Sequence, residues 1–284
     1  MKRELTEQQN IERSIIKKYR GEIWKRFLTA VSDYQLLQEG DRVAVCISGG
    51  KDSFLLAKCF QELQKHSPYD FHLEFLCMNP GYNEENAQLI EENASRLGIP
   101  LHTFHTEIFD IVFQESHSPC YLCARMRRGY LYKNAHALGC NKIALGHHFD
   151  DIIETILMSI LYSGEMRTMM PKLHSTNFPG MELIRPLYMV REQDIIAWVK
   201  YNDLRFLRCA CRFTEKEGDQ DEGKRQEMKR WIAQLRETNP YIESNIFRSV
   251  QNVNVDAVIG HKRGDGSRYH FLEDYDDKDR YEDE

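Results

Sequence analysis

Apolar residues in the first half of the chain follow two alternating spacings. Short segments dominated by apolar residues occur at 43–46, 71–78, 101–105 and 142–146, and runs of this length are typical of buried strands. Between them, residues 54–60, 83–97, 121–138 and 150–162 place apolar positions three and four apart, as amphipathic helices do. Repeated strand–helix–strand units predict an α/β fold whose parallel sheet has helices on both faces.

Helical patterns flank this region on both sides. Residues 7–33 predict a long N-terminal helix, and its basic polar face is either a solvated surface or a contact surface for a polynucleotide. Beyond residue 163 we expect an extended run at 183–187, a helix at 192–201, a strand at 204–207, and helices at 222–236 and 242–250. These patterns divide the chain into an N-terminal helix (1–40), an α/β domain (41–213), a C-terminal helical extension (214–262) and a tail (263–284).

Charge and composition favour a globular protein with an acidic end. Apolar residues make up 42% of the 284 residues and charged residues 29%. From residue 265 onward there are nine acidic and three basic residues, so the tail accounts for the whole formal net charge of −6. We expect this tail to be disordered. No stretch is apolar enough to span a bilayer and the first residues lack a signal sequence, so we expect a cytoplasmic protein without a membrane partner.

A glycine-rich turn follows the first predicted strand and precedes a helix. Gly49 and Gly50 allow the main chain to approach a phosphate closely, and N–H groups at a helix N-terminus attract anions. Ser48 and Ser53 add hydroxyl donors, and Lys51 adds a positive charge. The spacing is neither that of a Walker A loop nor that of a dinucleotide-binding turn. The pattern predicts a phosphate site of another type, as opposed to an ordinary turn of small residues.

A second polar group follows the strand at 142–146. It comprises Gly146, His147, His148, Asp150 and Asp151, and it opens the next helix. Asp150 could serve only as a helix cap, but two histidines and two carboxylates exceed what a cap needs. Carboxylates can hold Mg²⁺ and an imidazole can polarise a phosphate. Both polar groups follow parallel strands, so we expect them at the same edge of the sheet.

Four of the eight cysteines cluster in two pairs, Cys120 with Cys123 and Cys209 with Cys211. A CxxC at a helix start favours thiolates that bind metal or exchange disulfides. Four thiolates would suit zinc, three would suit an iron–sulfur cluster with an open position, and a persulfide-forming pair is the third interpretation. The other cysteines lie in apolar runs and are predicted to be core residues; they are Cys46, Cys59, Cys77 and Cys140.

Basic residues follow the CxxC on the same predicted helix. They are Arg125, Arg127, Arg128 and Lys133. They form either a charged helix face or a surface that neutralises the phosphates of ATP or RNA. Their position beside both candidate sites favours the phosphate-binding interpretation.

Together these motifs resemble the tRNA 2-thiocytidine synthetase family, TtcA, a branch of the PP-loop ATP pyrophosphatases. The resemblance extends over about residues 10 to 255. Its motifs are Ser48 to Ser53, Cys120-x-x-Cys123-x-Arg125-x-Arg127-Arg128-Gly129, Lys142-Ile143-Ala144-Leu145-Gly146-His147-His148-x-Asp150-Asp151, Met170-Pro171-Lys172-Leu173, Ile184-Arg185-Pro186-Leu187, Arg191-Glu192 and Gln251-Asn252-Val253.

The resemblance implies a Rossmann-like (adenine nucleotide alpha hydrolase-like) fold for residues 41–213. It also implies an enzyme that adenylates a tRNA base with ATP and Mg²⁺, at C2 of an anticodon-loop cytidine, and replaces the oxygen with sulfur. ATP would be bound by Ser48, Gly49, Gly50, Lys51, Asp52, Ser53, Asn79, Gly146, His147 and Asp150. Catalytic roles would fall to Lys51, Asp52, His147 and Asp151. RNA would contact Arg125, Arg127, Arg128 and Lys133.

A [4Fe-4S] cluster on three cysteines is also implied. The family has two late cysteines three apart, whereas here they are two apart. Counting back from Gln251-Asn252-Val253 favours Cys211 as the third ligand beside Cys120 and Cys123, with Cys209 as the alternative. The acidic residue that the family carries after the second strand is Asn79 here. The sulfur donor, either a cysteine desulfurase or free sulfide, and a homodimeric state stay open.

Other functions compete with this one. Lysidine-type adenylation of tRNA would not need the cysteines. A zinc-stabilised nucleotide-binding protein would use the cysteines as zinc ligands and would catalyse no reaction. A desulfurizing or sulfide-handling enzyme would act on free thiolated bases.

Overall fold

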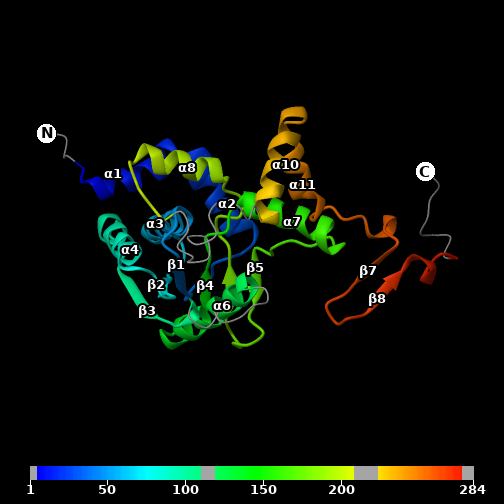
Figure 1. The fold of residues 1–284 in the computed structure, drawn as a ribbon, viewed down its shortest axis with the longest axis horizontal. Coiled ribbons are helices and arrows are strands. Elements are labelled where there is room, and N and C mark those ends of the chain that lie inside the picture. The colour runs from blue at the N-terminus through cyan, green and yellow to red at the C-terminus, as the bar shows by residue number, and fades with distance from the viewer. Residues whose placement is uncertain (1–4, 110–118, 208–222, 277–284) are drawn as a thin grey trace.

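A six-stranded sheet forms the centre of the computed structural model, which describes residues 5–109, 119–207 and 223–276, without the side chains of 119–121. The strand order is β3-β2-β1-β4-β6-β5 (Figure 1). The strands are β1 (Arg42–Ile47), β2 (His72–Asn79), β3 (Leu101–His105), β4 (Lys142–Ala144), β5 (Lys172–His174) and β6 (Glu182–Ile184). All pairings in this sheet are parallel except that of β5 with β6. The predicted α/β class and parallel sheet are confirmed.

Helices surround the sheet and extend beyond it at the C-terminal side. They are α1 (Glu7–Arg13), α2 (Lys25–Asp33), α3 (Lys51–His66), α4 (Glu84–Leu97), α6 (Pro119–Ala137), α7 (Phe149–Ser163), α8 (Glu192–Tyr201), α10 (Lys224–Thr238) and α11 (Ile242–Ser249). Each helix expected from the apolar spacing is present, although α3 extends six residues beyond the expected segment 54–60 and the helix expected at 7–33 is divided by two π-helical turns. Asn83 accepts a hydrogen bond at the start of α4, and Gly98 ends that helix in the left-handed conformation.

The alternation of side chains along β1 explains the two layers of helices. Val43, Val45 and Ile47 belong to a core that includes buried residues of α1, α3, α4 and α8. Ala44 and Cys46 belong to a separate core with residues of α6. Successive residues of a strand point to opposite faces, so a strand that is apolar at both sets of positions must be covered on both sides.

The N-terminal helix is irregular in its middle. Two π-helical turns, Ser14–Lys18 and Arg20–Trp24, separate α1 from α2. The buried Ser14 hydroxyl accepts hydrogen bonds from Trp198 Nε1 at 3.0 Å and Asn202 Nδ2 at 3.1 Å, both on or just after α8. This contact joins the N-terminal helix to the α/β body.

A buried ion pair also anchors this helix. Lys58, on α3, has a fully buried side chain whose Nζ lies 2.7 Å from Glu12 Oε1 and 2.8 Å from the carbonyl oxygen of Leu97. We expect Glu12→Ala to lower the free energy of unfolding by about 3 kcal/mol, because it leaves a buried cation without its counter-charge. Urea denaturation measures this loss.

Lys65 provides the matched control. Its Nζ lies 2.7 Å from the other oxygen of Glu12, but its side chain is 46% exposed. Lys65→Ala should therefore cost less than about 1 kcal/mol. Equal losses in the two variants would contradict the role assigned to the buried pair.

Three segments differ from the sequence-based expectation. Residues 204–207 are not a strand, because their apolar side chains pack in the core beside α3, where Phe206 stacks on Phe54 with ring centroids 5.1 Å apart. The short strand β5 was not expected. Part of the acidic tail is ordered, since Arg268–His270 (β8) pairs antiparallel with Gly260–Lys262 (β7) and a 3-10 turn occurs at Phe271–Glu273. Another 3-10 turn, Val255–Ala257, precedes the tail.

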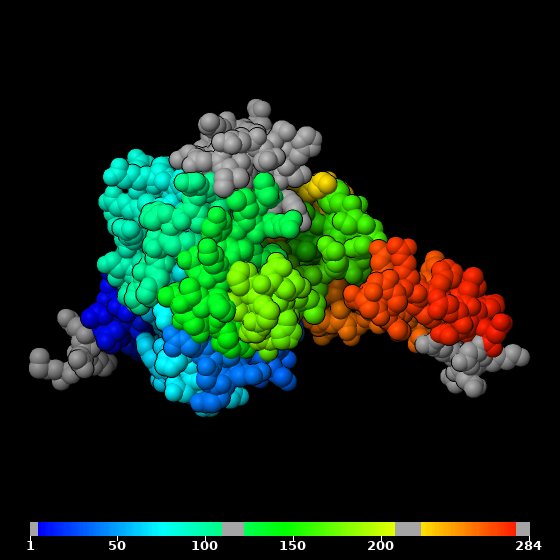
Figure 2. Space-filling view, turned by 90° about the horizontal axis from the view of Figure 1, so that it is seen from below, coloured from blue at the N-terminus to red at the C-terminus, as the bar shows by residue number. Residues whose placement is uncertain are grey.

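We call residues 251–276 the C-terminal arm. It leaves α11 and extends away from the body of the molecule, as the orange to red segment shows (Figures 1 and 2). In the ranges that the structure covers, no helix combines the length and apolar character needed to cross a membrane.

Candidate active site at the carboxyl edge of the sheet

The glycine-rich turn joins the central strand β1 to α3. Gly49 has φ = +87°, a conformation that other residues rarely adopt. Ser53 Oγ donates to the Gly50 carbonyl at 2.8 Å and accepts from the Ser48 N–H at 3.2 Å, so the turn is held by its own residues. No side chain caps the first turn of α3. Its N–H groups are therefore available to an anion, and the local geometry predicted for this stretch is confirmed.

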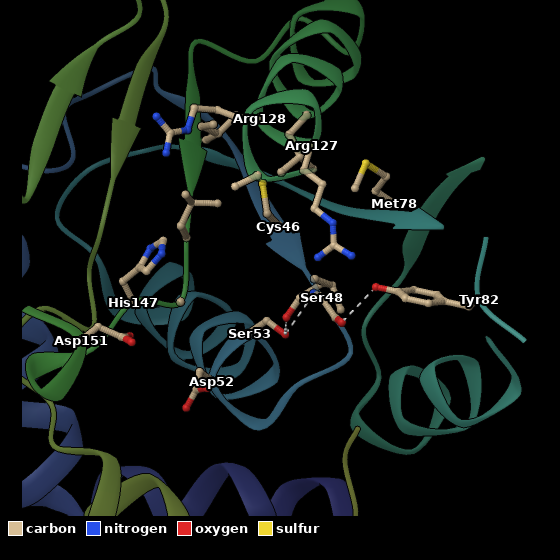
Figure 3. Close-up of a pocket in the computed structure, with 16 residues that line it drawn as sticks. Cys46, Ser48, Asp52, Ser53, Met78, Tyr82, Arg127, Arg128, His147 and Asp151 are labelled. Carbon is tan, nitrogen blue, oxygen red and sulfur yellow. Dashed lines mark hydrogen bonds between the residues drawn. The ribbon is translucent and has the colours of Figure 1, made fainter. Parts of the chain in front are cut away.

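A cavity of about 370 Å³ opens above this turn (Figure 3). It lies where strand order reverses, since β1 and β4 are neighbours and are followed by the two predicted polar groups. Eight predicted site residues line it: Ser48, Asp52, Ser53, Arg127, Arg128, Gly146, His147 and Asp151. Apolar side chains that line it with them include Met78, Leu131, Ile143 and Leu145. The cavity therefore has hydroxyls and charges for phosphates, and apolar walls for a flat ring.

Burial sets the charge of the polar residues in this cavity. It lowers the pKa of His147 to about 4, so the imidazole is neutral at pH 7. It raises the pKa of Asp52. For Asp151 burial acts in the same direction, but electrostatic attraction to His148, a hydrogen bond from the His148 N–H and the nearby Arg225 together hold the pKa below its ordinary value. Asp151 is therefore a stable carboxylate, as a metal ligand must be.

Two buried nitrogen atoms beside the cavity lack hydrogen-bond partners. His147 Nδ1 and Arg127 Nε make no hydrogen bond with the described residues. Buried polar atoms are usually paired, and an unpaired one is costly. Their position indicates that a bound ligand completes the site.

Other residues that were predicted to bind ATP form hydrogen bonds within the protein itself. Asp150 accepts the backbone N–H of Glu192 at 2.7 Å and so holds the start of α8. Asn79 accepts the N–H groups of Gly81 and Tyr82 at 2.9 and 2.8 Å, which shapes the turn after β2. Gly49 and Gly50 contribute the backbone of the loop. The ATP-binding roles of these residues stay predictions.

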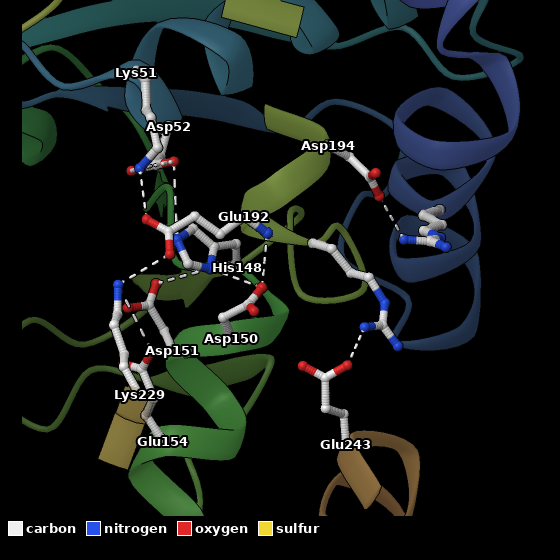
Figure 4. Close-up of polar contacts among 12 residues, drawn as sticks. Lys51, Asp52, His148, Asp150, Asp151, Glu154, Glu192, Asp194, Lys229 and Glu243 are labelled. Carbon is white, nitrogen blue, oxygen red and sulfur yellow. Dashed lines mark hydrogen bonds and ion pairs between the residues drawn. The ribbon is translucent and has the colours of Figure 1, made fainter. Parts of the chain in front are cut away.

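Lys51 points to a different set of partners. Its Nζ lies 3.2 Å from Asp52 and 3.0 Å from Glu192, and it lines a neighbouring hollow with α8 residues (Figure 4). Its catalytic role also stays a prediction. On α6, Arg127 and Arg128 reach the cavity, whereas Arg125 and Lys133 are exposed and are not among the cavity-lining residues of the described ranges.

The CxxC lies on the helix that lines the cavity. Cys123 is half-buried in α6, packs in a cluster with Met78 and precedes Arg127 by one helical turn. Cys120 lies in the first turn of α6, but its side chain is outside the described part, as are Cys209 and Cys211 altogether. The prediction that Cys46, Cys59, Cys77 and Cys140 are buried is confirmed. Burial raises the pKa of the Cys46 thiol to about 12.

Tyr82 and a network of charged residues contribute to the site beyond the sequence-based prediction. The Tyr82 hydroxyl lies 3.5 Å from the Ser48 carbonyl oxygen. Arg225, from α10, donates to Asp151 at 2.8 Å and to Glu154 at 3.1 Å. Lys229, one turn later, donates to Glu192 at 2.9 Å (Figure 4). The four-residue spacing of Arg225 and Lys229 indicated that they share a helix face, but not which partners they would meet.

Glu154 gives this network a measurable pH dependence. Its side chain is 1% exposed, and burial raises its pKa to about 7 from an ordinary value of 4.5. Between these values the folded protein binds more protons than the unfolded chain, so stability falls as pH rises. We expect Glu154→Gln to remove this fall, and the unfolding free energies of the two proteins to diverge by up to about 3 kcal/mol between pH 4 and 8. Urea denaturation across this range tests it, and parallel curves would contradict it.

Comparisons with known proteins agree with this geometry. Residues 20–211 match the family model described as the PP-loop domain. The chain belongs to the PP-loop family. Within it, the chain is 35% identical over 252 residues to a tRNA-cytidine(32) 2-sulfurtransferase of Pelobacter propionicus, covering 88% of this chain and 90% of the relative. It is 37% identical to the corresponding protein of Syntrophotalea carbinolica, covering 79% of this chain and 86% of that one. The chain therefore belongs to the tRNA-cytidine 2-sulfurtransferase branch of the PP-loop family.

A solved structure shares the fold of this PP-loop protein. The U34-tRNA thiolase NcsA from Methanococcus maripaludis, solved with its [4Fe-4S] cluster, matches with a TM-score of 0.67. The match is 20% identical in sequence and covers 83% of this chain and 79% of NcsA. The Rossmann-like fold implied by the sequence motifs is confirmed.

Proposed function

We propose that this PP-loop protein is an ATP-dependent tRNA sulfurtransferase that replaces O2 of an anticodon-loop cytidine with sulfur. The observation that carries the proposal is the meeting of the PP-loop, the His147–Asp151 segment and the CxxC helix α6 around one cavity. Its relatives named tRNA-cytidine(32) 2-sulfurtransferases support the choice of cytidine.

In the first step the cavity would bind ATP. Ser48, Ser53 and the first N–H groups of α3 would hold the phosphates, and Arg127 and Arg128 would balance their charge. O2 of the base would attack the α-phosphorus, the bond to the β-phosphate would break, and pyrophosphate would leave. The base is then O-adenylated and its C2 is open to attack.

Mg²⁺ fits the carboxylates of this cavity. Asp52 and Asp151 both line it, and carboxylate oxygens are preferred Mg²⁺ ligands. These two residues would hold the ion, which supplies charge neutralisation for the phosphates when bound. The neutral His147, whose Nδ1 has no hydrogen-bond partner among the described residues, would hydrogen-bond to a phosphate oxygen.

An iron–sulfur cluster fits the donor set on α6. Cys123 is half-buried beside Met78, which lines the cavity, and thiolates are the ligands of such clusters. Cys120, Cys123 and Cys211, with Cys209 as the alternative to Cys211, would hold a [4Fe-4S] group, which supplies a coordination site for sulfide when bound. Sulfide would form a bond to C2, and AMP would leave with the original oxygen. The NcsA fold, which this chain shares, accommodates a cluster of this type.

Thiolation by anaerobically purified, iron- and sulfide-reconstituted protein tests the proposal. With ATP, Mg²⁺, sulfide and unmodified tRNA, we expect one AMP and one pyrophosphate for each 2-thiocytidine, detected by mass spectrometry of nucleosides. Loss of 2-thiocytidine from the tRNA of a strain without the gene is the matching cellular result. A colourless protein with stoichiometric zinc, or loss of sulfur from thiolated bases, would overturn it.

The sulfur donor, the oligomeric state and the location stay predictions. We expect a cysteine desulfurase or free sulfide to supply the sulfur and the protein to act in the cytoplasm, and the quaternary state, a homodimer or another, stays open. Assays with each donor, cell fractionation and analytical ultracentrifugation test them separately.

A further inference from the structure

The C-terminal arm lies outside the part of the chain that matches the PP-loop domain. The family match ends at residue 211, and the arm begins at residue 251. Its regular structure is a two-stranded hairpin of β7 and β8, paired only with each other among the described strands. Such a hairpin is marginally stable in water by itself. The arm stands clear of the body (Figures 1 and 2), so a bound partner would have access to it.

A basic groove separates the arm from the loop that follows α7. It encloses about 830 Å³. Four apolar side chains form part of its lining, Met166, Val253, Val255 and Val258. The charged side chains that line it are four basic ones, Arg167, Lys262, Arg263 and Arg268, and one acidic one, Glu165. Glu165 lies 3.3 Å from Arg167 and 3.2 Å from Lys262. One carboxylate neutralises only one of the two cations that it contacts. The groove therefore keeps an excess of positive charge.

Two arginines of the groove have unused hydrogen-bonding capacity. The side chains of Arg263 and Arg268 are exposed and form no ion pair with the described residues, although each guanidinium carries five N–H donors. Tyr269, next to Arg268 on β8, also lines the groove. Free guanidinium groups beside a tyrosine are well suited to phosphate oxygens and sugars.

Helix α7 sets the distance between this groove and the cavity. Asp151 lies in the first turn of α7 and lines the cavity, whereas Glu165 lies just beyond its last turn and lines the groove. A helix of 15 residues is about 22 Å long. A cavity of about 370 Å³ is far too small for a whole tRNA, so most of a tRNA must lie on the outer surface. A groove at the far end of α7 is within reach of that RNA.

We propose that the groove between the C-terminal arm and the loop after α7 binds the phosphate backbone of tRNA at a distance from the modified base. This inference rests on the proposed function and adds the surface that positions the substrate. Four basic side chains against one carboxylate favour a polyanion over a second copy of this chain. Backbone contacts of this kind fix orientation without reading sequence.

Direct measurement of tRNA affinity tests the groove without requiring catalysis. We expect the double variant Arg263→Ala/Arg268→Ala to raise the Kd for unmodified tRNA at least about tenfold at 0.15 M salt. The slope of log affinity against log salt concentration should become shallower by about 2, because two phosphate contacts are lost. The KM for ATP should stay unchanged, since neither arginine lines the cavity.

The charge-conserving variant Arg263→Lys/Arg268→Lys is the matched control, and it should keep most of the affinity and the original salt slope. Circular dichroism of both variants shows whether the arm is still folded. An unchanged Kd and slope in the alanine variant would overturn the proposal, as would dissociation of a dimer with tRNA affinity retained. A wild-type protein that binds tRNA through the groove but never thiolates it would refute the proposed function alone.

Discussion

Gly49→Ala is expected to reduce kcat/KM for ATP by about 100-fold or more. Gly49 has φ = +87°, and an alanine Cβ there would lie 2.7 Å from Leu207 Cδ1 and 2.9 Å from Ile90 Cγ1. A left-handed conformation costs a non-glycine residue about 1–3 kcal/mol, and the contact with the branched Ile90 adds to it. The loop would relieve this by moving its N–H groups away from the phosphates, and each 1.4 kcal/mol lost is a factor of ten. ATP-dependent pyrophosphate release measures the effect.

Gly40→Ala separates backbone strain from damage to the site. Gly40 also has a positive φ, +79°, but a Cβ there would meet nothing within 4 Å. It should lower the free energy of unfolding by about 1–2 kcal/mol and leave ATP turnover unchanged. If Gly49→Ala behaved in the same way, the close approach of the loop to phosphate would be refuted.

Cys123→Ala is expected to abolish formation of 2-thiocytidine while ATP binding persists. Cys123 lies on α6 beside the cavity but is not among the residues of the described ranges that line it, so its loss leaves the phosphate-binding side chains in place. A cluster deprived of one thiolate ligand is lost or unstable. The measurements are iron and sulfide content, the broad visible absorbance of the anaerobic protein, ATP affinity and thiolation.

Cys140→Ala is the control for this substitution. Cys140 is buried in the core between the sheet and α6, away from the CxxC, and it is predicted to be only a packing residue. The variant should keep its colour and its thiolation activity. A Cys123→Ala protein with full iron content and normal thiolation would remove this cysteine from the reaction.

The parts of the site that lie within one continuous stretch could be predicted from the sequence. The PP-loop from Ser48 to Ser53 needs a strand, two glycines and a helix start, and these features are visible in one stretch of sequence. The same holds for the helix start at His148, where Asp151 accepts the His148 N–H at 3.1 Å. Local hydrogen bonds and backbone preferences determine both turns.

The contacts between distant stretches could not be predicted in this way. Arg225 meets Asp151 across 74 residues, and Lys51 meets Glu192 across 141. The sequence predicted a helix at 222–236 without its partners, and packing of that helix on α7 places Arg225 and Lys229 at the site. The sequence also did not show that the Asn79 side chain, at the end of β2, accepts two N–H groups of the turn that follows. The ATP-binding role of Asn79 stays a prediction.

The sequence alone predicted the parallel α/β fold, the phosphate loop and membership of an ATP-using tRNA thiolation family. Their signals are periodic burial and short motifs, which the chain expresses locally. The tertiary structure alone decided that β1 and β4 are neighbours, that α6 brings its arginines over the loop between them, and that the arm stands apart with a basic groove. Strand order and helix docking depend on how whole faces pack, and no single stretch of sequence contains that information.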